Sequence, residues 1–403
     1  MTLLEGVFNT VPRTGWPTEL NKKSLASELM RLFPNGASPI TGLSAMLGTT
    51  TAVASTHGYF SKTAEFVATT VGANYAIAAA TVTLASTAGL GVGSLIHNVT
   101  TRENMRVTAV NSATVVAVTK GFGRVADAAG TSGDKIICIG TAAAENSNRP
   151  TARQFPVVYV PNYTQIFRNA WAVTGTAKAS LAEANFVNIA ESRRDAALLH
   201  QIDQEAATIW GQAKMDTSGS QPIHSTQGII DAVRQYASSN YTTAGGTTTL
   251  TQLITALEPA FKYSSDVSNP RLRYAWGDAK AINVINQIAI KNATVTVTPE
   301  TTTFGMDYQN FKFYKGSIRL MEHSLLNGFD STAGRLIVVD VPCVKLAYMK
   351  GRNAYVEQYG DGGKIVENGT DGTGGSFTSE MAVELRNPYG CAVIEGLTAG
   401  AAG

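Results

Sequence analysis

The sequence predicts an α+β protein in which a small all-β unit is inserted into a larger body. Short β-rich runs fill the chain from about Val71 to Ala142, a long helix-forming stretch runs from about Ala177 to Lys214, and helices alternate with strands after it. The 403 residues exceed one typical compact domain. The 38 glycines favour tight turns and close backbone contacts over a catalytic apparatus. We therefore expect several structural units in one chain.

Composition and charge argue against several classes of protein. Charged residues make up 15% of the chain, and 32 Lys and Arg against 30 Asp and Glu leave a net charge of +2, too little for a strong duplex binder. No apolar run approaches the roughly 20 residues of a membrane span, and the first residues lack a signal peptide pattern. Cys138, Cys343 and Cys391 stand among apolar neighbours and predict buried free thiols. We expect a protein made in the cytoplasm, without a membrane partner.

The first 50 residues are expected to form an arm. One short amphipathic helix is predicted near Ser24–Phe33, after Pro17 and before the breaker Pro34-Asn35-Gly36. Such a segment buries little on itself. It must lie on another surface, either a neighbouring subunit or its own body.

The stretch 73–145 is predicted to be a small inserted β domain. Five short strands at nearly regular spacing indicate a closed barrel or a sandwich. Within it, Val107–Val118 predicts a hairpin with Asn111-Ser112 in the turn. The flanking segments 51–72 and 146–174 are expected to be extended and to pair as the two legs of a loop that carries the insertion.

The segment Ala177–Lys214 contains no proline and predicts one helix of about 50 to 60 Å, which would serve as a strut. Its apolar residues form two stripes that point in different directions, so its two halves are expected to bury different faces. The first stripe is Ala182, Phe186 and Ile189, and the second is Leu199, Ile202, Ala206 and Ile209.

The rest of the chain predicts a compact α/β unit at 223–335, followed by strands from Arg335 onward. The closing strands are interrupted by a glycine-rich loop at 360–375. We expect the closing part of the chain to pack against the long helix.

The order arm, extended loop, long helix, α/β unit and closing strands resembles the Hong Kong 97-type major capsid protein fold, and more narrowly the SU10-type capsid family of tailed bacteriophages. Three strings carry the likeness: "SPITGLSAML" at 38–47, "NYTQIFRNAWAVTGTAKA" at 162–179 and "MAVELRNPYGCAVIEGL" at 381–397. The chain departs from the minimal pattern of this fold in two ways. It contains the barrel-like stretch, and it has no long charged helical leader before residue 50. A separate scaffolding protein is therefore implied, or a leader cleaved before this numbering begins.

The resemblance implies a domain for each part of the chain. These are an N-terminal arm (1–50), an extended loop (51–72 and 146–174) with its inserted β domain (73–145), a peripheral domain with the spine helix (175–222 and 336–403) and an axial domain (223–335). It also implies self-assembly into hexamers and pentamers of an icosahedral head around double-stranded DNA. The implied partners are copies of the chain, a cement or decoration protein, a scaffolding protein, a portal, and packaged DNA through weak contacts.

The sequence predicts no catalytic, cofactor or metal site. "GLGVGS" at 89–94 has Ser94 where a dinucleotide loop needs glycine, so a β-turn is favoured, and Lys364 lacks the rest of a phosphate loop. No pair of the five scattered histidines has metal-ligand spacing; these are His57, His97, His200, His224 and His323. His200 is expected to be a packed or hydrogen-bonded helix residue.

Other interpretations remain open at this point. Arg193-Arg194 could contact DNA or a neighbouring subunit, or lie on a solvated helix face. An encapsulin-like shell protein uses the same fold. A small-molecule-binding or catalytic α/β protein would have Asp231, Asp278 and Lys280 as its acid and base candidates. Lys62 and Asn387 are of the types that an isopeptide bond between subunits uses, but nothing in the sequence pairs them, and we predict no such bond.

Overall fold

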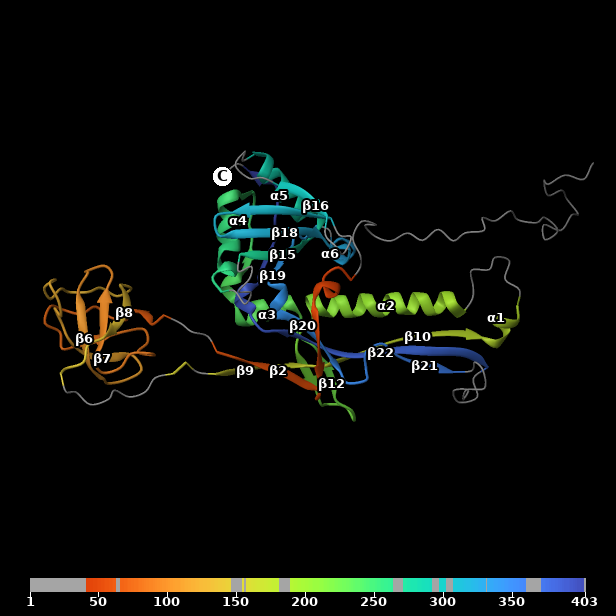
Figure 1. The fold of residues 1–403 in the computed structure, drawn as a ribbon, viewed down its shortest axis with the longest axis horizontal. Coiled ribbons are helices and arrows are strands. Elements are labelled where there is room, and N and C mark those ends of the chain that lie inside the picture. Colours follow the sequence, from red (N-terminus) through yellow and green to blue (C-terminus); the bar gives the residue numbers. More distant parts are fainter. Residues whose placement is uncertain are drawn as a thin grey trace, which may run out of the picture. The chain divides into compact units, whose positions relative to one another are not determined.

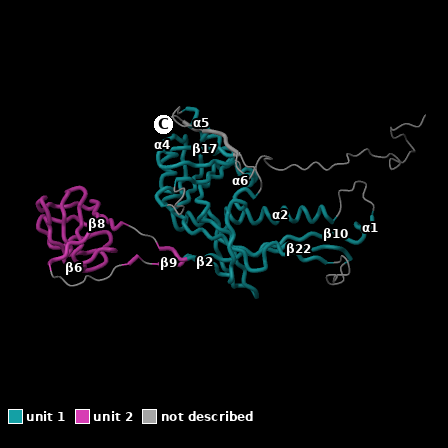
Figure 2. The backbone as a smooth tube through the Cα atoms, in the orientation of Figure 1, with its two compact units in different colours: residues 1–59, 160–403 teal, residues 60–159 magenta. Residues whose placement is uncertain are grey.

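The computed structural model describes residues 41–62, 66–145, 154–155, 157–180, 189–263, 271–291, 297–301, 307–330, 332–359 and 371–401. The chain divides into two compact units, residues 60–159 and the remainder (Figure 2). The helix expected at 24–33, the residue Lys364 and the apolar pair Ala182 and Phe186 lie outside the described residues.

The unit 60–159 contains a small closed β-barrel, whose strands appear in Figure 1. Its sheet has the order β3-β8-β5-β6-β7-β4. The two outer strands meet at an antiparallel bridge between Val71 and Leu84, which closes the sheet. The strands are β3 (Ala68–Thr70), β4 (Thr81–Thr83), β5 (Ser94–Asn98), β6 (Asn104–Val110), β7 (Val115–Thr119) and β8 (Lys135–Thr141). Because β3 precedes residue 73, the barrel begins earlier than the predicted insertion.

The barrel confirms the predicted hairpin. Strands β6 and β7 pair antiparallel, and the backbone N–H groups of Asn111 and Ser112 both donate to the Val115 carbonyl, at 3.0 and 3.2 Å. Alternate strand residues point inward and form a core of their own, as strand periodicity requires. Its buried members are Val71, Tyr75, Val82, Leu84, Leu90, Ile96, Met105, Val107, Val116, Val118 and Ile136.

The extended segments on either side of the barrel pair as predicted. Strands β2 (Thr56–Ser61) and β9 (Val158–Tyr163) form a two-stranded sheet. The Thr164 N–H donates to the Ser55 carbonyl at 2.8 Å, just beyond the paired strands.

A long sheet forms one part of the larger unit, with the order β1-β20-β22-β10 and with β21 paired to β22. Its strands are β1 (Gly48–Ala52), β10 (Gln165–Thr174), β20 (Val344–Met349), β21 (Tyr355–Tyr359) and β22 (Gly372–Leu385). Strands β10 and β22 pair antiparallel from Gln165 and Met381 to Thr174 and Gly372. The glycines at 372, 374 and 375 therefore belong to a strand rather than to the predicted loop, of which 360–370 lies outside the described residues.

The predicted helix Ala177–Lys214 is wrong as one continuous element. A short helix α1 (Gly175–Ala179) ends at Ser180, whose backbone is extended (φ −75°, ψ 131°), and α2 spans Ile189–Trp210. The 22 residues described for α2 span about 33 Å. The helix ends where Gly211 meets Gly228, whose N–H donates to the Gly211 carbonyl at 2.9 Å. A Cβ at Gly211 would lie 2.4 Å from the Thr226 carbonyl oxygen, so only glycine allows this approach.

The predicted apolar stripe on the second half of this helix is also wrong in part. Leu199 is 53% exposed and Ile202 is half-buried, whereas Ile209 is buried. The buried residues of α2 are Ala196, His200, Glu205, Thr208 and Ile209. Hydrophobic periodicity misses this face because two of its largest members are polar residues whose hydrogen-bond partners come from distant parts of the chain.

A seven-stranded sheet forms the other part of the larger unit, with the order β13-β23-β19-β15-β18-β17-β16. Its strands are β13 (Tyr241–Thr243), β15 (Leu272–Gly277), β16 (Val297–Thr301), β17 (Asp307–Phe313), β18 (Gly316–Glu322), β19 (Leu336–Val339) and β23 (Ala392–Glu395). Neighbouring residues alternate between two cores, so Trp276 and Ile337 enter one and Ala275 and Val338 the other. Because β19 and β23 belong to this sheet, the expected boundary at residue 336 does not separate the two sheets.

Helices cover both faces of the seven-stranded sheet. The first core takes side chains from α3 (Ile229–Tyr236) and α6 (Ser324–Asp330), and the second from α4 (Leu250–Leu257) and α5 (Ala279–Lys291). The remaining short pairs are β11 (Lys214–Asp216) with β12 (Ile223–Ser225), and β14 (Thr248–Thr249) with β24 (Gly400–Ala401).

Residues 41–50 lie on the body of their own chain. Leu43 and Leu47 are buried in the first core, and β1 pairs parallel with β20 from Gly48 onward. The α+β class and the order of parts implied by the resemblance are thus present: loop legs, long helix, α/β unit and closing strands. The three cysteines are free as predicted, although Cys138 is only partly buried, and burial raises the pKa of the Cys391 thiol to about 12.

Candidate functional site

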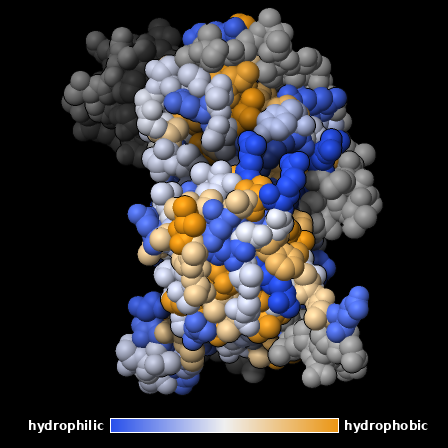
Figure 3. Space-filling model, turned by 90° about the vertical axis from the view of Figure 1, so that its left-hand side faces the viewer, coloured by the Kyte–Doolittle hydropathy of each residue, from blue (hydrophilic) through white to orange (hydrophobic). Residues whose placement is uncertain are grey.

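The legs of the extended loop carry apolar side chains that the chain itself leaves exposed. Val53 is 86% exposed and Phe60 is 74% exposed. On the returning leg, Val157, Val158 and Tyr159 are exposed as well. An accumulation of large apolar side chains on a narrow extended segment is typical of a surface that another molecule covers. On the face that Figure 3 presents, hydrophobic and hydrophilic residues are intermixed.

Buried polar groups hold the base of these legs to the long sheet. The Asn162 amide donates to the Val383 carbonyl at 2.6 Å, and its oxygen accepts from the Gln227 N–H at 2.8 Å. The His57 ring nitrogen Nε2 lies 2.8 Å from Glu384 Oε2. Burial opposes ionisation of Glu384, yet hydrogen bonds from His57 and Arg386 hold the pKa of this carboxyl below its usual range. The legs therefore leave the body at a defined place.

A second cluster joins α2 to the end of the arm. The Glu205 carboxylate is fully buried and accepts from the Leu43 N–H at 2.8 Å, from the Ser44 N–H at 3.1 Å and from His323 Nε2 at 2.9 Å. His323 accepts the Leu325 N–H on its other nitrogen at 3.2 Å, which places its proton on Nε2, facing Glu205. One carboxylate thus connects three segments of the chain.

His200 forms a third cluster, between α2 and the long sheet. Its Nδ1 lies 2.8 Å from Asn169 Oδ1 on β10, and its Nε2 lies 2.8 Å from Ser379 Oγ on β22. Burial lowers the pKa of His200, so the ring is neutral near pH 7. His200 is a hydrogen-bonded helix residue, as the sequence predicted.

The outer face of the long sheet is hollowed by small residues. Opposite α2, Ala170 and Ala172 on β10 stand beside Gly372 and Gly374 on β22, and the hollow has a volume of about 480 Å³. An ion pair between Arg168 and Glu357, at 3.0 Å, borders it. Ile166 and Tyr355 on the same face are more than half exposed. This face could receive an apolar segment from another molecule.

The acid and base candidates of the enzymatic interpretation do not come together. Asp278 is buried and accepts from the Ala281 N–H at 2.7 Å, so it caps α5. Lys280 donates to the Thr332 carbonyl at 2.7 Å. Asp231 accepts from the Gln227 amide at 2.7 Å on α3, which covers the opposite face of the seven-stranded sheet. These contacts give all three residues structural roles.

The other singled-out residues also have local contacts. Gly89 (φ 78°) and Gly93 (φ 83°) adopt turn conformations in "GLGVGS", as predicted. His97 lies 2.7 Å from Asn104, and His224 stacks on Tyr163. The Arg193 guanidinium lies over the ring of Trp171, at 5.5 Å from its centroid.

Over the described ranges, no group of three His, Cys, Asp or Glu side chains could hold a metal ion. Within those same ranges, no helix is both long and apolar enough to cross a membrane. Lys62 belongs to the smaller unit and Asn387 to the larger one. The absence of a bond between subunits stays a prediction.

A family model and a relative of known name indicate the same kind of protein. A family model described as SU10 major capsid protein matches residues 8–398. The major capsid protein of Pseudomonas phage PaMx41 is 45% identical over 408 residues, which cover 98% of this chain and 97% of that protein. A solved structure titled Mycobacterium phage Adephagia is 10% identical with a TM-score of 0.43, over 95% of this chain and 96% of that chain. The holo-SrpI encapsulin complex from Synechococcus elongatus is 11% identical with a TM-score of 0.43, over 60% of this chain and 78% of that chain.

Proposed function

The chain belongs to the SU10 major capsid protein family, and we propose that its copies assemble into hexamers and pentamers of an icosahedral phage head around double-stranded DNA. The observation that carries this proposal is the exposed apolar surface of the extended loop, anchored at its base by buried polar contacts. Because its base is anchored, this segment can contact a neighbouring subunit at a defined position. The protein is a shell component, and no catalytic step is part of the proposal.

The loop legs of one copy and the hollowed outer sheet face of the next copy are the complementary surfaces of this assembly. A head-to-tail contact between different patches closes into a ring when the rotation between subunits is right. The exposed Val53 and Phe60 supply apolar area, and the floor of Ala170, Ala172 and Gly374 supplies space for it. Burial of each large apolar side chain stabilises the contact by about 1.5–3 kcal/mol.

The domain roles are part of the proposal. Residues 1–50 act as the arm, 51–72 and 146–174 as the extended loop, and 73–145, extended back to include β3, as the inserted β domain. The peripheral part comprises α2 with the long sheet, and the axial part is the seven-stranded sheet with its helices.

The further partners of the proposal are those of a phage head. They are a scaffolding protein and a portal during assembly in the host cytoplasm, a cement or decoration protein on the finished shell, and packaged DNA through weak contacts. The family match and the Pseudomonas phage relative support a virion component over an encapsulin-like shell around enzyme cargo.

Electron microscopy of the expressed full chain tests the assembly. We expect closed particles from the unaltered protein and folded, unassembled subunits from Phe60→Asp, because a charge on this leg prevents its burial against a neighbour. Val92→Asp is the matched control, since Val92 is 63% exposed on a barrel turn and is not part of the leg segments 51–72 and 146–174. Normal particle yield from Phe60→Asp would contradict the role of the loop.

A further inference from the structure

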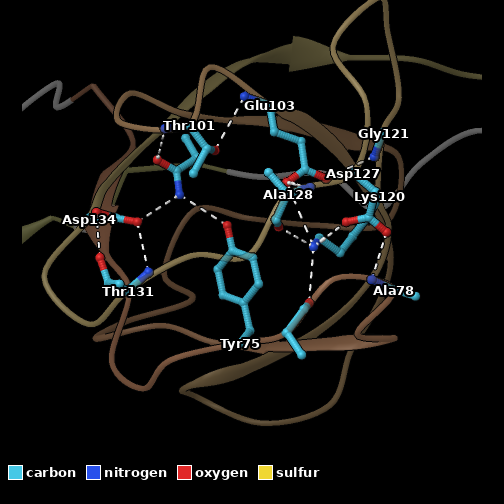
Figure 4. A network of polar contacts seen from close by, with 12 residues as sticks. Tyr75, Ala78, Thr101, Glu103, Lys120, Gly121, Asp127, Ala128, Thr131 and Asp134 are labelled. Carbon is cyan, nitrogen blue, oxygen red and sulfur yellow. Dashed lines mark hydrogen bonds and ion pairs between the residues drawn. The ribbon is translucent and has the colours of Figure 1, made fainter.

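The inserted barrel buries an amine between two carboxyl groups, and no part of the proposed assembly uses them (Figure 4). Lys120 follows β7, and its side chain is 3% exposed. Its Nζ contacts Asp127 Oδ1 and lies 3.7 Å from Glu103 Oε2. The Glu103 side chain is 0% exposed and that of Asp127 is 28% exposed. The Lys120 amine, the Asp127 carboxyl group and the Glu103 carboxyl group thus lie together in a site with little solvent exposure.

Several contacts hold the amine against the carboxyl group. Nζ donates to the Ala76 carbonyl at 3.2 Å and to the Ala128 carbonyl at 2.5 Å. The ring of Tyr75 covers it, with the centroid 4.7 Å from Nζ. Reacting groups that are held in contact in this way behave as in an intramolecular reaction with a high effective concentration.

The two carboxyl groups are held just as firmly. The Ala78 N–H donates to Asp127 Oδ2 at 2.8 Å. Glu103 accepts from the Gly121 N–H at 2.9 Å and from the Ala128 N–H at 3.3 Å. A hydrogen bond from Lys120, followed by that from the Ala78 N–H, holds the pKa of Asp127 below its usual range. The Glu103 carboxyl group faces the same amine, with its Oε2 3.7 Å from Nζ, and can serve as a proton carrier.

We propose that Lys120 and Asp127 form an amide bond inside the folded barrel, with Glu103 carrying the proton. A proton shift within the ion pair gives a neutral amine and a neutral acid without net proton uptake, and burial makes this shift less costly than it is in water. Nζ then attacks Cγ of Asp127, while the Ala78 N–H stabilises the negative charge that develops on Oδ2.

The step balances without an added reactant. Glu103 takes one proton from Nζ and delivers it to Oδ1, which leaves as water. One N–C bond forms, one C–O bond breaks, and no atom is oxidised or reduced. Glu103 ends in its starting state, so a single folded chain completes the reaction.

Another ion pair of the same chain provides an internal control. Lys315 contacts Glu258 as Lys120 contacts Asp127, but their side chains are 35% and 40% exposed. Water competes there for both groups and keeps them charged. We expect no bond between Lys315 and Glu258, so burial and the proton carrier, rather than contact alone, distinguish the reactive pair.

Tryptic peptide mapping of the unfolded full-length protein tests the bond. Amide formation blocks cleavage after Lys120 while cleavage after Arg124 continues. We expect one species in which residues 107–124 are joined to 125–135, lighter than the two peptides together by one water molecule. Separate peptides 107–120, 121–124 and 125–135 at full mass would overturn the proposal.

Variants separate the bond from the fold. Asp127→Ala is expected to restore cleavage after Lys120, and Glu103→Gln is expected to keep the barrel folded, as read by circular dichroism, while leaving the bond unformed. Lys315 is expected to be cleaved normally in every sample. Complete bond formation in Glu103→Gln would overturn the role of Glu103, and the same cleavage block in Asp127→Ala would overturn the assignment of the acceptor.

Discussion

The barrel and the helix α2 bury their inner faces in different ways. The barrel core consists of alternating strand residues such as Ile96, Met105 and Val116, whose neighbours all lie within the same compact unit. The buried face of α2 instead includes His200 and Glu205, whose partners lie at residues 43, 169, 323 and 379. The barrel is thus stabilised by the burial of apolar surface, whereas the buried face of α2 is stabilised by polar groups whose hydrogen bonds are satisfied. Loss of one partner is therefore costly in α2, where it leaves a buried polar group unpaired.

Removal of the barrel is expected to have the largest effect on unfolding. Replacing residues 66–145 with a short Gly/Ser linker should remove one unfolding transition and leave that of the larger unit unchanged, because each unit has its own core. Differential scanning calorimetry measures both transitions. A second variant replaces only residues 73–142. It leaves β3 without its partner strand β8, so we expect lower solubility than for the longer replacement. If the larger unit fails to fold in both variants, the two units are not independent.

Glu205→Ala is expected to cost about 3–5 kcal/mol of unfolding free energy in the larger unit, because it leaves His323 and the Leu43 N–H buried without an acceptor and the part-buried Ser44 N–H without its partner. Denaturant titration measures this loss. Leu199→Ala on the same helix is the matched control, with an expected change within about 0.5 kcal/mol, since Leu199 is exposed. Equal losses in the two variants would show that the buried face of α2 is assigned wrongly.

Ile96→Ala is expected to cost about 2–4 kcal/mol in the barrel transition alone, through lost burial and the cavity left behind. Ile96 is fully buried in the barrel core. The exposed Ile77→Ala, in the same unit, should change this transition little. An effect of Ile96→Ala on the transition of the larger unit would mean that the two cores are coupled.

His200 is expected to make a smaller, pH-dependent contribution to the free energy of unfolding. Because burial lowers the pKa of His200 in the folded state below the ordinary histidine value of about 6.5, the unfolded state binds more protons as the pH falls below about 6.5, and stability decreases there. The stability is fully present above that pH. Comparing urea unfolding of the unaltered protein and His200→Gln from pH 8 to pH 5 isolates this contribution, and the variant should show the weaker dependence. A variant with the same pH dependence as the unaltered protein would contradict a neutral buried His200.

Much of the strand architecture follows from the sequence by itself. The period-2 runs at 104–110 and 115–119 become β6 and β7, and the turn chemistry of Asn111-Ser112 places the hairpin between them. The pairing of the loop legs follows from two extended segments that flank a closed insertion. The strands and the hairpin rest on side-chain alternation and on contacts between residues near in sequence, and a sequence displays both directly.

The end of the long helix and its buried face needed the tertiary structure. Gly211 ends α2 because it meets Gly228, and Glu205 is buried because Leu43, Ser44 and His323 supply its hydrogen-bond donors. The meeting of Lys120, Glu103 and Asp127 likewise depends on how the barrel closes. A sequence shows which groups are polar, but only the fold decides which partners satisfy them, because the free energy of a buried polar group is set by neighbours that are distant along the chain.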